Sequence, residues 1–302
     1  MSEAQEIAAH ASGLSLAAGA ASHSEGVLTR AIGIASHVEG GNIDEAGEAM
    51  PPFTFPEDYT SDLDTTITIE STMAGGNVSH AEGVMTLALE YASHSEGALT
   101  LAKGVVSHAE GVGTLSGNIA SHAEGGETKA LGEISHAEGM GSVAFGAGTH
   151  AEGNQTLAAG NYSHSEGGET TASASYSHAE GYSSSTGENA EAAHAEGYQT
   201  KATGYASHSE GFTTKAESQG AHAEGVSTTA SGIASHAEGH QTSAWENYSH
   251  AEGDGTVAKG ESSHAEGKGT VTSIAITGGA SATTYTLDPT TTVIYAGHVI
   301  KY

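Results

Sequence analysis

The sequence contains no cysteine, only eight lysine and arginine residues together, and few large apolar residues. The absence of cysteine excludes disulfides and metals held by thiolates. The formal net charge of −29 argues against binding to nucleic-acid phosphates and to anionic membrane surfaces, so we expect neither nucleic acid nor membrane as a partner. No apolar run approaches the roughly 20 residues that a membrane-spanning helix needs.

Leu, Ile, Val and Phe together account for 42 of the 302 residues. Such a low content, combined with high net charge, is typical of disordered chains. What the chain has instead is a phrase, Ser-His-Ala-Glu-Gly or a close variant, which recurs sixteen times and almost always at a spacing of fourteen residues. A fixed short period indicates one structural unit stacked many times, so we expect a folded repeat protein.

The repeat unit, well represented by residues 121–134 (SHAEGGETKALGEI), contains two segments of alternating character, each followed by glycine and a short turn. In the first segment Ser, Ala and Gly share one face, while His and Glu share the other. In the second segment Thr, Ala and Gly share a face, and variable residues occupy the other. This pattern predicts an all-β protein, a parallel β-roll (β-solenoid) with two strands per coil and its small residues turned inward.

Breaks in the period define the expected domains. Residues 1–20 read as an N-terminal cap with one degenerate coil, residues 21–267 as the β-roll, and residues 268–302 as a small C-terminal β-element. The interval from His37 to His80 is 43 residues instead of fourteen, so we expect an insertion at 41–76, rich in proline, with a strand at 65–70. A two-residue bulge is expected around 183–189.

A fourteen-residue roll repeat built on small residues resembles the head domain of trimeric autotransporter adhesins of the YadA type. The SHAEG version is similar to repeats in phage tail-fibre and appendage proteins. The resemblance covers roughly residues 10–267, and it implies a left-handed roll and a homotrimeric rod. Here His and Glu stand where the adhesin heads have Val and Ile.

His and Glu do not vary over the sixteen motifs, whereas the residues after each motif glycine vary freely. We therefore expect these His and Glu residues to form a ladder at the trimer interface, where each His donates to a Glu of a neighbouring subunit. A solvated outer ladder and a metal site on the trimer axis remain alternatives. The ladder comprises His23, Glu25, His37, Glu39, His80, Glu82, His94, Glu96, His108, Glu110, His122, Glu124, His136, Glu138, His150, Glu152, His164, Glu166, His178, Glu180, His194, Glu196, His208, Glu210, His222, Glu224, His236, Glu238, His250, Glu252, His264 and Glu266.

No constellation typical of a catalytic nucleophile, zinc protease or phosphate-binding loop is present in the sequence, so we expect no enzyme, no catalytic residue, no metal and no cofactor. The repeated Thr residues share the inward parity of Ala and Gly, which disfavours an ice-binding surface. The candidate binding surface is aromatic, because rings at turn or outward positions suit sugar faces. Its members are Tyr182, Tyr198, Phe212, Trp245 and Tyr248. Rings that seal turn edges are the alternative.

The resemblance to phage tail-fibre repeats implies a structural and receptor-binding fibre of a phage tail or tail-like particle that attaches to a host cell-surface glycan or protein. The N-terminus lacks the basic and apolar regions of a secretory signal, so we expect synthesis in the cytoplasm without a signal peptide and an extracellular location on a virion. A cell-surface adhesin or self-assembling extracellular filament is the alternative function. A polysaccharide-degrading spike would need an acidic pair in a groove, which the sequence does not reveal.

Overall fold

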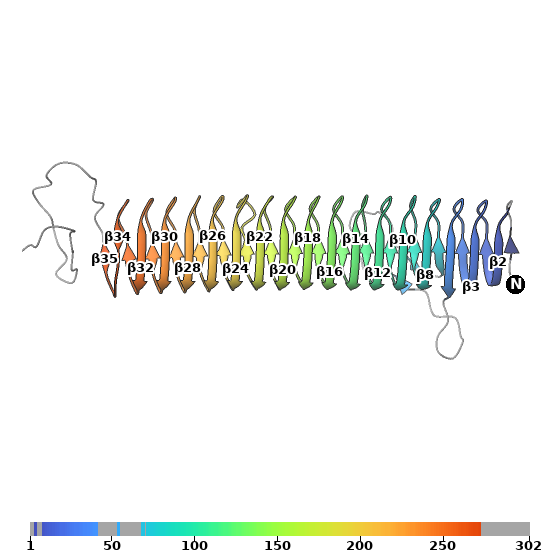
Figure 1. The fold of residues 1–302 in the computed structure, drawn as a ribbon, viewed down its shortest axis with the longest axis horizontal. Helices are drawn as coiled ribbons and strands as arrows, with labels where there is room; N and C mark the ends of the chain where they lie inside the picture. Colours follow the sequence, from blue (N-terminus) through green and yellow to red (C-terminus); the bar gives the residue numbers. More distant parts are fainter. Residues whose placement is uncertain (1–2, 5–7, 42–52, 55–67, 70, 273–302) are drawn as a thin grey trace, which may run out of the picture. The chain divides into compact units, whose positions relative to one another are not determined.

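The computed structural model describes residues 3–4, 8–41, 53–54, 68–69 and 71–272, and these residues form strands and turns with no helix. No helix in this part of the chain is therefore of a length and apolarity to cross a membrane. The chain divides into two compact units, residues 1–168 and 169–302, and each is a parallel β-solenoid (Figure 1).

In the first unit, each coil contains a longer strand that begins at a motif histidine and a shorter strand that follows the first turn. The longer strands are β2 (His10–Ala17), β3 (His23–Ala31), β4 (His37–Gly41), β8 (His80–Val84), β10 (His94–Ala98), β12 (His108–Val112), β14 (His122–Gly126), β16 (His136–Met140), β18 (His150–Asn154) and β20 (His164–Gly168). The shorter strands are β7 (Thr72–Ala74), β9 (Leu87–Ala88), β11 (Leu101–Ala102), β13 (Leu115–Ser116), β15 (Lys129–Ala130), β17 (Val143–Ala144) and β19 (Leu157–Ala158).

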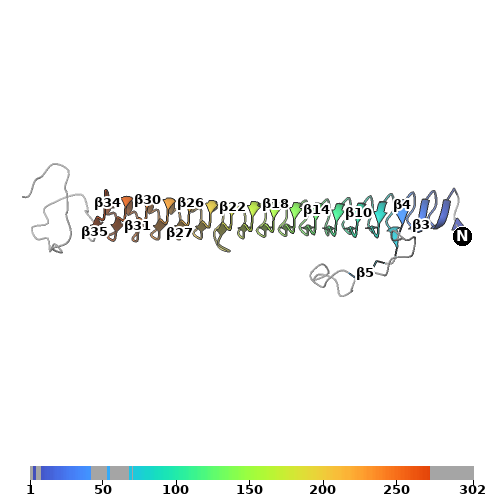
Figure 2. The ribbon, with the colours of Figure 1, turned by 90° about the horizontal axis from the view of Figure 1, so that it is seen from below.

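The second unit repeats this arrangement. Its longer strands are β22 (His178–Tyr182), β24 (His194–Tyr198), β26 (His208–Phe212), β28 (His222–Val226), β30 (His236–His240), β32 (His250–Asp254) and β34 (His264–Ala265). Its shorter strands are β21 (Thr171–Ala172), β23 (Ser185–Thr186), β25 (Lys201–Ala202), β27 (Lys215–Ala216), β29 (Thr229–Ala230), β31 (Ser243–Ala244), β33 (Val257–Ala258) and β35 (Val271–Thr272). Figure 2 shows the longer and shorter strands on opposite sides of the coils, for example β30 opposite β31.

Within each unit, parallel pairing joins the longer strands of successive coils with no shift in register, except between β2 and β3, where the register shifts between Leu14 and Ser15. His94 pairs with His108 and Glu96 with Glu110, and the same holds for β8 with β10 and for β24 with β26. Because the side-chain period of a strand is two, this register places every motif histidine above the next and every motif glutamate above the next. The expectation of a parallel β-solenoid with fourteen-residue coils is confirmed.

The interior is made almost wholly of small residues. Ala109 and Ala123 of the longer strands and Ala102 and Ala130 of the shorter strands are fully buried, as is Thr114. Small side chains suit an interior whose two walls lie close together, although Val38 occupies the position of the motif alanine and is also fully buried. The motif serine has a local role as well, since Ser107 Oγ donates to the carbonyl of Gly104 at 2.7 Å and so closes the turn before the longer strand.

One group of variable residues departs from the expectation that variable positions face solvent. Leu87, Leu101 and Leu115 have the outward parity of the shorter strands but are buried. They form a hydrophobic cluster with Met85, against which Leu99 and other partly buried residues pack. The second unit has exposed Lys201 and Lys215 at the equivalent positions, so this cluster belongs to the first unit only.

The insertion begins and ends differently from the expected 41–76. The chain has rejoined the solenoid at β7, which pairs in parallel with β3, so residues 72–76 belong to a coil. Within the insertion, β5 (Phe53–Thr54) pairs antiparallel with β6 (Thr68–Ile69), which lies inside the strand expected at 65–70. The rest of the insertion and nearly all of the C-terminal β-element lie outside the described residues. Residues 3–4 form β1 (Glu3–Ala4), which pairs with Leu16 and Ala17 of β2.

Each coil places a residue with left-handed backbone conformation in both of its turns, and this was not expected from the sequence. Ile134 has φ of 55° and Gln155 has φ of 55°. This conformation is unfavourable for side chains other than glycine, particularly β-branched ones. The stack compensates through hydrogen bonds between coils: the Ile134 N–H donates to the carbonyl of Ile119, and the Gln155 N–H to that of Met140, at 2.9 and 2.8 Å.

Candidate functional site: the His–Glu ladder

The motif histidines and glutamates lie side by side on the outward face of the longer strands, and we call this surface the His–Glu ladder. It follows directly from strand alternation, since the Ala between His and Glu points inward. The imidazole rings of His94 and His108 are parallel within 2° and their centroids are 4.6 Å apart. Most other neighbouring pairs in the same unit stack in the same way, for example His108 on His122 at 4.7 Å.

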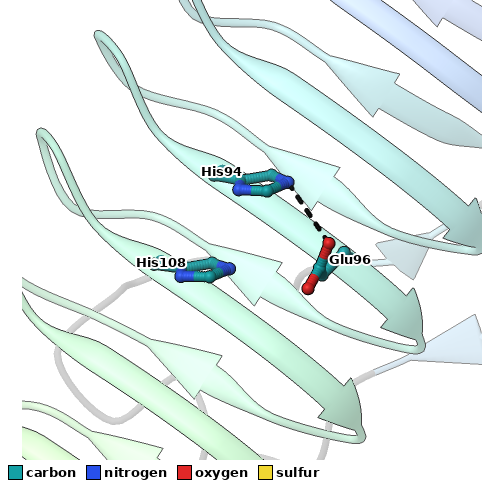
Figure 3. Close-up of side chains that lie close together, drawn as sticks. All are labelled: His94, Glu96 and His108. Carbon is teal, nitrogen blue, oxygen red and sulfur yellow. Dashed lines mark ion pairs between the residues drawn. The ribbon is translucent and has the colours of Figure 1, made fainter.

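Many ladder histidines, including His94 and His108, direct Nε2 towards the glutamate two residues later. The distance from Nε2 to Oε2 is 3.6 Å for His94–Glu96 (Figure 3). It is also 3.6 Å for His108–Glu110. These distances exceed the usual 2.7–3.2 Å of a hydrogen bond to oxygen. Among the described residues, the Nε2 atoms of His94 and His108 are buried without a hydrogen-bond partner. These two histidines are therefore closely packed but lack a hydrogen-bond partner for Nε2 among the described residues.

Some histidines lie between two carboxylates. His136 Nε2 is 3.6 Å from Glu124 Oε1 of the preceding coil and 4.0 Å from Glu138 Oε2 of its own coil. In the second unit the corresponding contact becomes a hydrogen bond between His250 Nε2 and Glu238 Oε1, at 3.2 Å.

Protonation is disfavoured at several ladder histidines of the first unit, among them His80, His108 and His136. Partial burial lowers the pKa of His80, His108 and His136 below its ordinary value, and the positive charge of a neighbouring protonated histidine lowers it further. The nearby glutamates act in the opposite direction but do not reverse the result. These three imidazoles are therefore predominantly neutral near pH 7.

The glutamates alternate in acidity. Hydrogen bonding with the glutamates of adjacent coils raises the pKa of Glu110 and of Glu138 to about 7, whereas the same bonds lower the pKa of Glu124 between them. Carboxylates stacked at the roughly 4.8 Å spacing of parallel strands repel each other, and a shared proton relieves this repulsion. In the first unit, Glu82, Glu96, Glu110, Glu124 and Glu138 also line a groove of about 680 Å³ together with the motif glycines.

The aromatic candidates do not form one surface. Tyr182, Tyr198 and Phe212 are all exposed and stack on one another along one turn edge, with centroids 5.4 and 5.0 Å apart. This stacking turns both faces of Tyr198 towards its neighbours and leaves only ring edges outward. Trp245 and Tyr248 lie at two other turn positions of their coil, and Lys259 Nζ lies 5.0 Å from the Trp245 ring centroid. The ring faces that a sugar would need are thus partly occupied by the chain itself.

A polar group on the same turn edge as Tyr182 was not identified in the sequence analysis. His240 Nδ1 lies 2.9 Å from Asp254 Oδ1, and Lys268 Nζ lies 3.2 Å from Asp254 Oδ2. The fourteen-residue spacing of these three residues was the available signal, because equivalent positions in successive coils are neighbours. The tyrosine hydroxyl of Tyr182 similarly donates to Glu169 at 3.0 Å.

Comparison of the sequence with models of known protein families found no match, and a search of curated proteins found no similar sequence.

Proposed function

We propose that this chain is a structural and receptor-binding fibre of a phage tail or tail-like particle, and that three copies assemble along the His–Glu ladder. In this proposal the solenoid, left-handed as in the adhesin heads that it resembles, is a stiff extension and performs no chemistry. It is made in the cytoplasm, functions outside the cell on the particle, and attaches to a host glycan or protein. The repeated architecture supports a mechanical role, because every coil adds the same set of parallel hydrogen bonds to the solenoid.

The observation that carries the proposal is a partly exposed surface whose residue types, His and Glu, are the same in every motif of the chain. Ladder side chains such as His108 and Glu110 are each 32% exposed, yet His and Glu are unchanged in all sixteen motifs. The equally outward position after the motif glycine holds Val112, Gly126, Met140 and other residues in successive coils. Solvent imposes no such uniformity, whereas an interface with another copy, repeated at every coil, does impose it.

The chemistry of the ladder is consistent with a second copy as the occupant. His94 and His108 present Nε2 atoms that lack hydrogen-bond partners within the described chain. Glutamates of a neighbouring copy supply acceptors at the same spacing, because all copies share the same coil repeat. Burial of these groups without such partners would be unfavourable by about 1–3 kcal/mol for each group. Three copies around one axis, as in the adhesin heads, would satisfy all three ladders.

The test is the mass of the chain in solution, measured by light scattering near neutral pH. We expect three times the 30.1 kDa of one chain. The double variant Glu110→Lys, Glu138→Lys changes two ladder carboxylates and should dissociate the assembly. The matched control, Glu127→Lys, Glu133→Lys, changes two exposed turn carboxylates and should remain trimeric. A monomeric wild-type chain, or equal behaviour of the two variants when both are folded by circular dichroism, would refute assembly along the ladder.

Attachment is a separate part of the proposal and needs its own experiment. Fluorescently labelled protein is applied to a glycan array and to intact bacterial cells of several types. Saturable binding to one cell type or glycan class supports a receptor-binding fibre. Absence of saturable binding, together with end-to-end joined rods in electron micrographs, would instead favour the self-assembling filament.

A further inference from the structure

We propose that neighbouring coils bind divalent transition-metal ions, with zinc as the best fit, through the Nε2 atoms of two stacked histidines and a carboxylate oxygen of the glutamate beside them. The clearest instance joins His94, Glu96 and His108 (Figure 3), whose candidate ligand atoms all lie within 4.8 Å of one another. The same triplet recurs in other pairs of coils, including His136, Glu138 and His150. This inference concerns each chain's own ladder and does not rest on trimer formation. An Nε2 atom that coordinates an ion carries no proton to donate to a neighbouring copy, so one histidine serves either the ion or the interface.

The distances within a triplet suit a shared ion better than a direct contact. Two ligands at the usual 2.0–2.2 Å from a tetrahedral zinc ion are about 3.3–3.5 Å apart. His94 Nε2 and Glu96 Oε2 are 3.6 Å apart, which is close to this separation and too long for a good hydrogen bond. The rings of His94 and His108 are parallel within 2° with centroids 4.6 Å apart, so both must tilt towards each other before their in-plane Nε2 lone pairs converge on one ion.

The Nε2 atoms of the histidines in a triplet are available to coordinate a metal ion. The Nε2 atoms of His94 and His108 are shielded from solvent and have no hydrogen-bond partner among the described residues. Both rings project the same edge towards Glu96, as Figure 3 shows. Two imidazoles and one carboxylate form a donor set that zinc accepts, with a water molecule as the fourth ligand, whereas calcium and magnesium prefer oxygen ligands alone.

The charge of the ladder favours the same occupant. The chain carries a formal charge of −29, and its ladder glutamates lie in register from coil to coil. A doubly charged ion between two coils reduces the repulsion between their carboxylates, and the ligands need no rearrangement of the backbone. The sites overlap, however, because His108 also belongs to the triplet with Glu110 and His122. Since Nε2 has one lone pair, at most one ion can bind for every two motifs.

The test is calorimetric titration of the metal-free full chain with zinc chloride. We expect saturation at no more than half the number of motifs, and persistence of binding in a large excess of magnesium chloride. A stoichiometry of one ion per motif, or loss of binding in excess magnesium, would overturn the inference, because either result indicates association with carboxylates alone.

Two variants with equal numbers of substitutions provide the matched control. The alternating variant replaces every second ladder histidine and so breaks every triplet: His37→Gln, His94→Gln, His122→Gln, His150→Gln, His178→Gln, His208→Gln, His236→Gln and His264→Gln. The block variant replaces eight consecutive ones and leaves the triplets before them intact: His164→Gln, His178→Gln, His194→Gln, His208→Gln, His222→Gln, His236→Gln, His250→Gln and His264→Gln.

We expect the alternating variant to lose zinc binding and the block variant to retain about half of the sites, because a triplet needs two adjacent histidines. Equal zinc stoichiometry in the two variants would overturn the inference. A readout on the unsubstituted chain keeps the test decisive if a variant does not fold. Cobalt(II) added in place of zinc should give the intense visible absorption of tetrahedral coordination, and the weak spectrum of hydrated cobalt would contradict the proposal.

Discussion

Gly111 lies against Gly125, its equivalent in the next coil, so closely that a Cβ added to Gly111 would be 2.1 Å from the Gly125 carbonyl oxygen. Gly111 also has φ of 103°, a conformation that L side chains rarely adopt. The motif glycine is therefore required both by backbone conformation and by the approach of the next coil.

This relationship predicts that Gly111→Ala destabilises the chain by about 3 kcal/mol or more, because the new methyl group meets backbone that cannot move aside. Gly126→Ala is the matched control, since a Cβ at Gly126 would meet nothing within 4 Å. Its effect should lie within about 0.5 kcal/mol of zero. Thermal unfolding followed by circular dichroism measures both, and comparable losses in the two variants would contradict the steric explanation.

His108 should titrate below its ordinary pKa. Burial and a neighbouring histidine lower the pKa of His108 in the folded chain, so the unfolded chain takes up this proton more readily. The stability that neutral His108 provides is then present above the unfolded pKa of about 6.5 and is lost as the pH falls through the folded value. An NMR titration of the His108 ring should show a midpoint below 6.5, and a midpoint above it would reverse the sign.

The variant His108→Gln tests, through thermal stability, whether protonation of His108 opposes folding. Glutamine cannot be protonated, so it removes the penalty that acid imposes on folded His108. We expect its melting temperature to fall short of the wild-type value by more at pH 8 than at pH 5. A deficit that is larger at pH 5 would mean that protonated His108 is stabilised by Glu96 and Glu110.

Glu110→Gln should act in the opposite pH range. The pKa of Glu110 is raised to about 7, so stability from its protonated form is present below the unfolded pKa of about 4.5 and is lost as the pH rises through about 7. Glutamine preserves the neutral state at pH 8, and repulsion between exposed carboxylates is worth about 0.2–1 kcal/mol. We expect a rise in melting temperature of about 1–3 °C at pH 8 and little change at pH 5.

The control for Glu110 is Glu133→Gln, which removes an exposed turn carboxylate in a neighbouring coil. It should leave the melting temperature nearly unchanged at both pH values. A similar rise at pH 8 in both variants would attribute the effect to the overall negative charge of the chain and not to the register of the ladder.

Tyr198→Ala tests the stacked aromatic edge. Tyr198 contacts Tyr182 on one side and Phe212 on the other, and such ring pairs contribute about 0.5–1.5 kcal/mol each. We expect a loss of about 1–3 kcal/mol for Tyr198→Ala and near-wild-type stability for Tyr198→Phe. Tyr205→Ala removes a tyrosine with no stacked ring among the described residues and should cost less. Equal losses for Tyr198→Ala and Tyr205→Ala would show that the stack contributes nothing.

Several elements of the fold were predictable from the sequence because they follow from local alternation. The fourteen-residue period predicted the coil, and the parity of Ala109 and Thr114 placed them inward, where both are buried. The same parity placed His108 and Glu110 together on the outer face. These features depend on only two facts, the period-two geometry of a strand and the need for equivalent residues to stack in register.

Other features could not be read from the period. The return of the chain to the solenoid at Thr72 depends on pairing with Thr29, which the irregular sequence of the insertion does not reveal. The stacking of Tyr182 on Tyr198 depends on the turn conformation, which exposure alone does not specify. Both features depend on a contact between residues of different coils. The turns that bring those residues together have conformations that the residue types do not specify.

The sequence by itself determined the repeat, its strand positions, its inward and outward faces and the presence of the ladder, because each coil carries that information locally. Only the tertiary structure decided the left-handed turn at Ile134, the 3.6 Å separation of His94 and Glu96, and the proton sharing between Glu110 and its neighbours. The physical reason is that these properties depend on the spacing and rotation between coils, which arise from hydrogen bonds between residues about fourteen positions apart and not from any one coil alone.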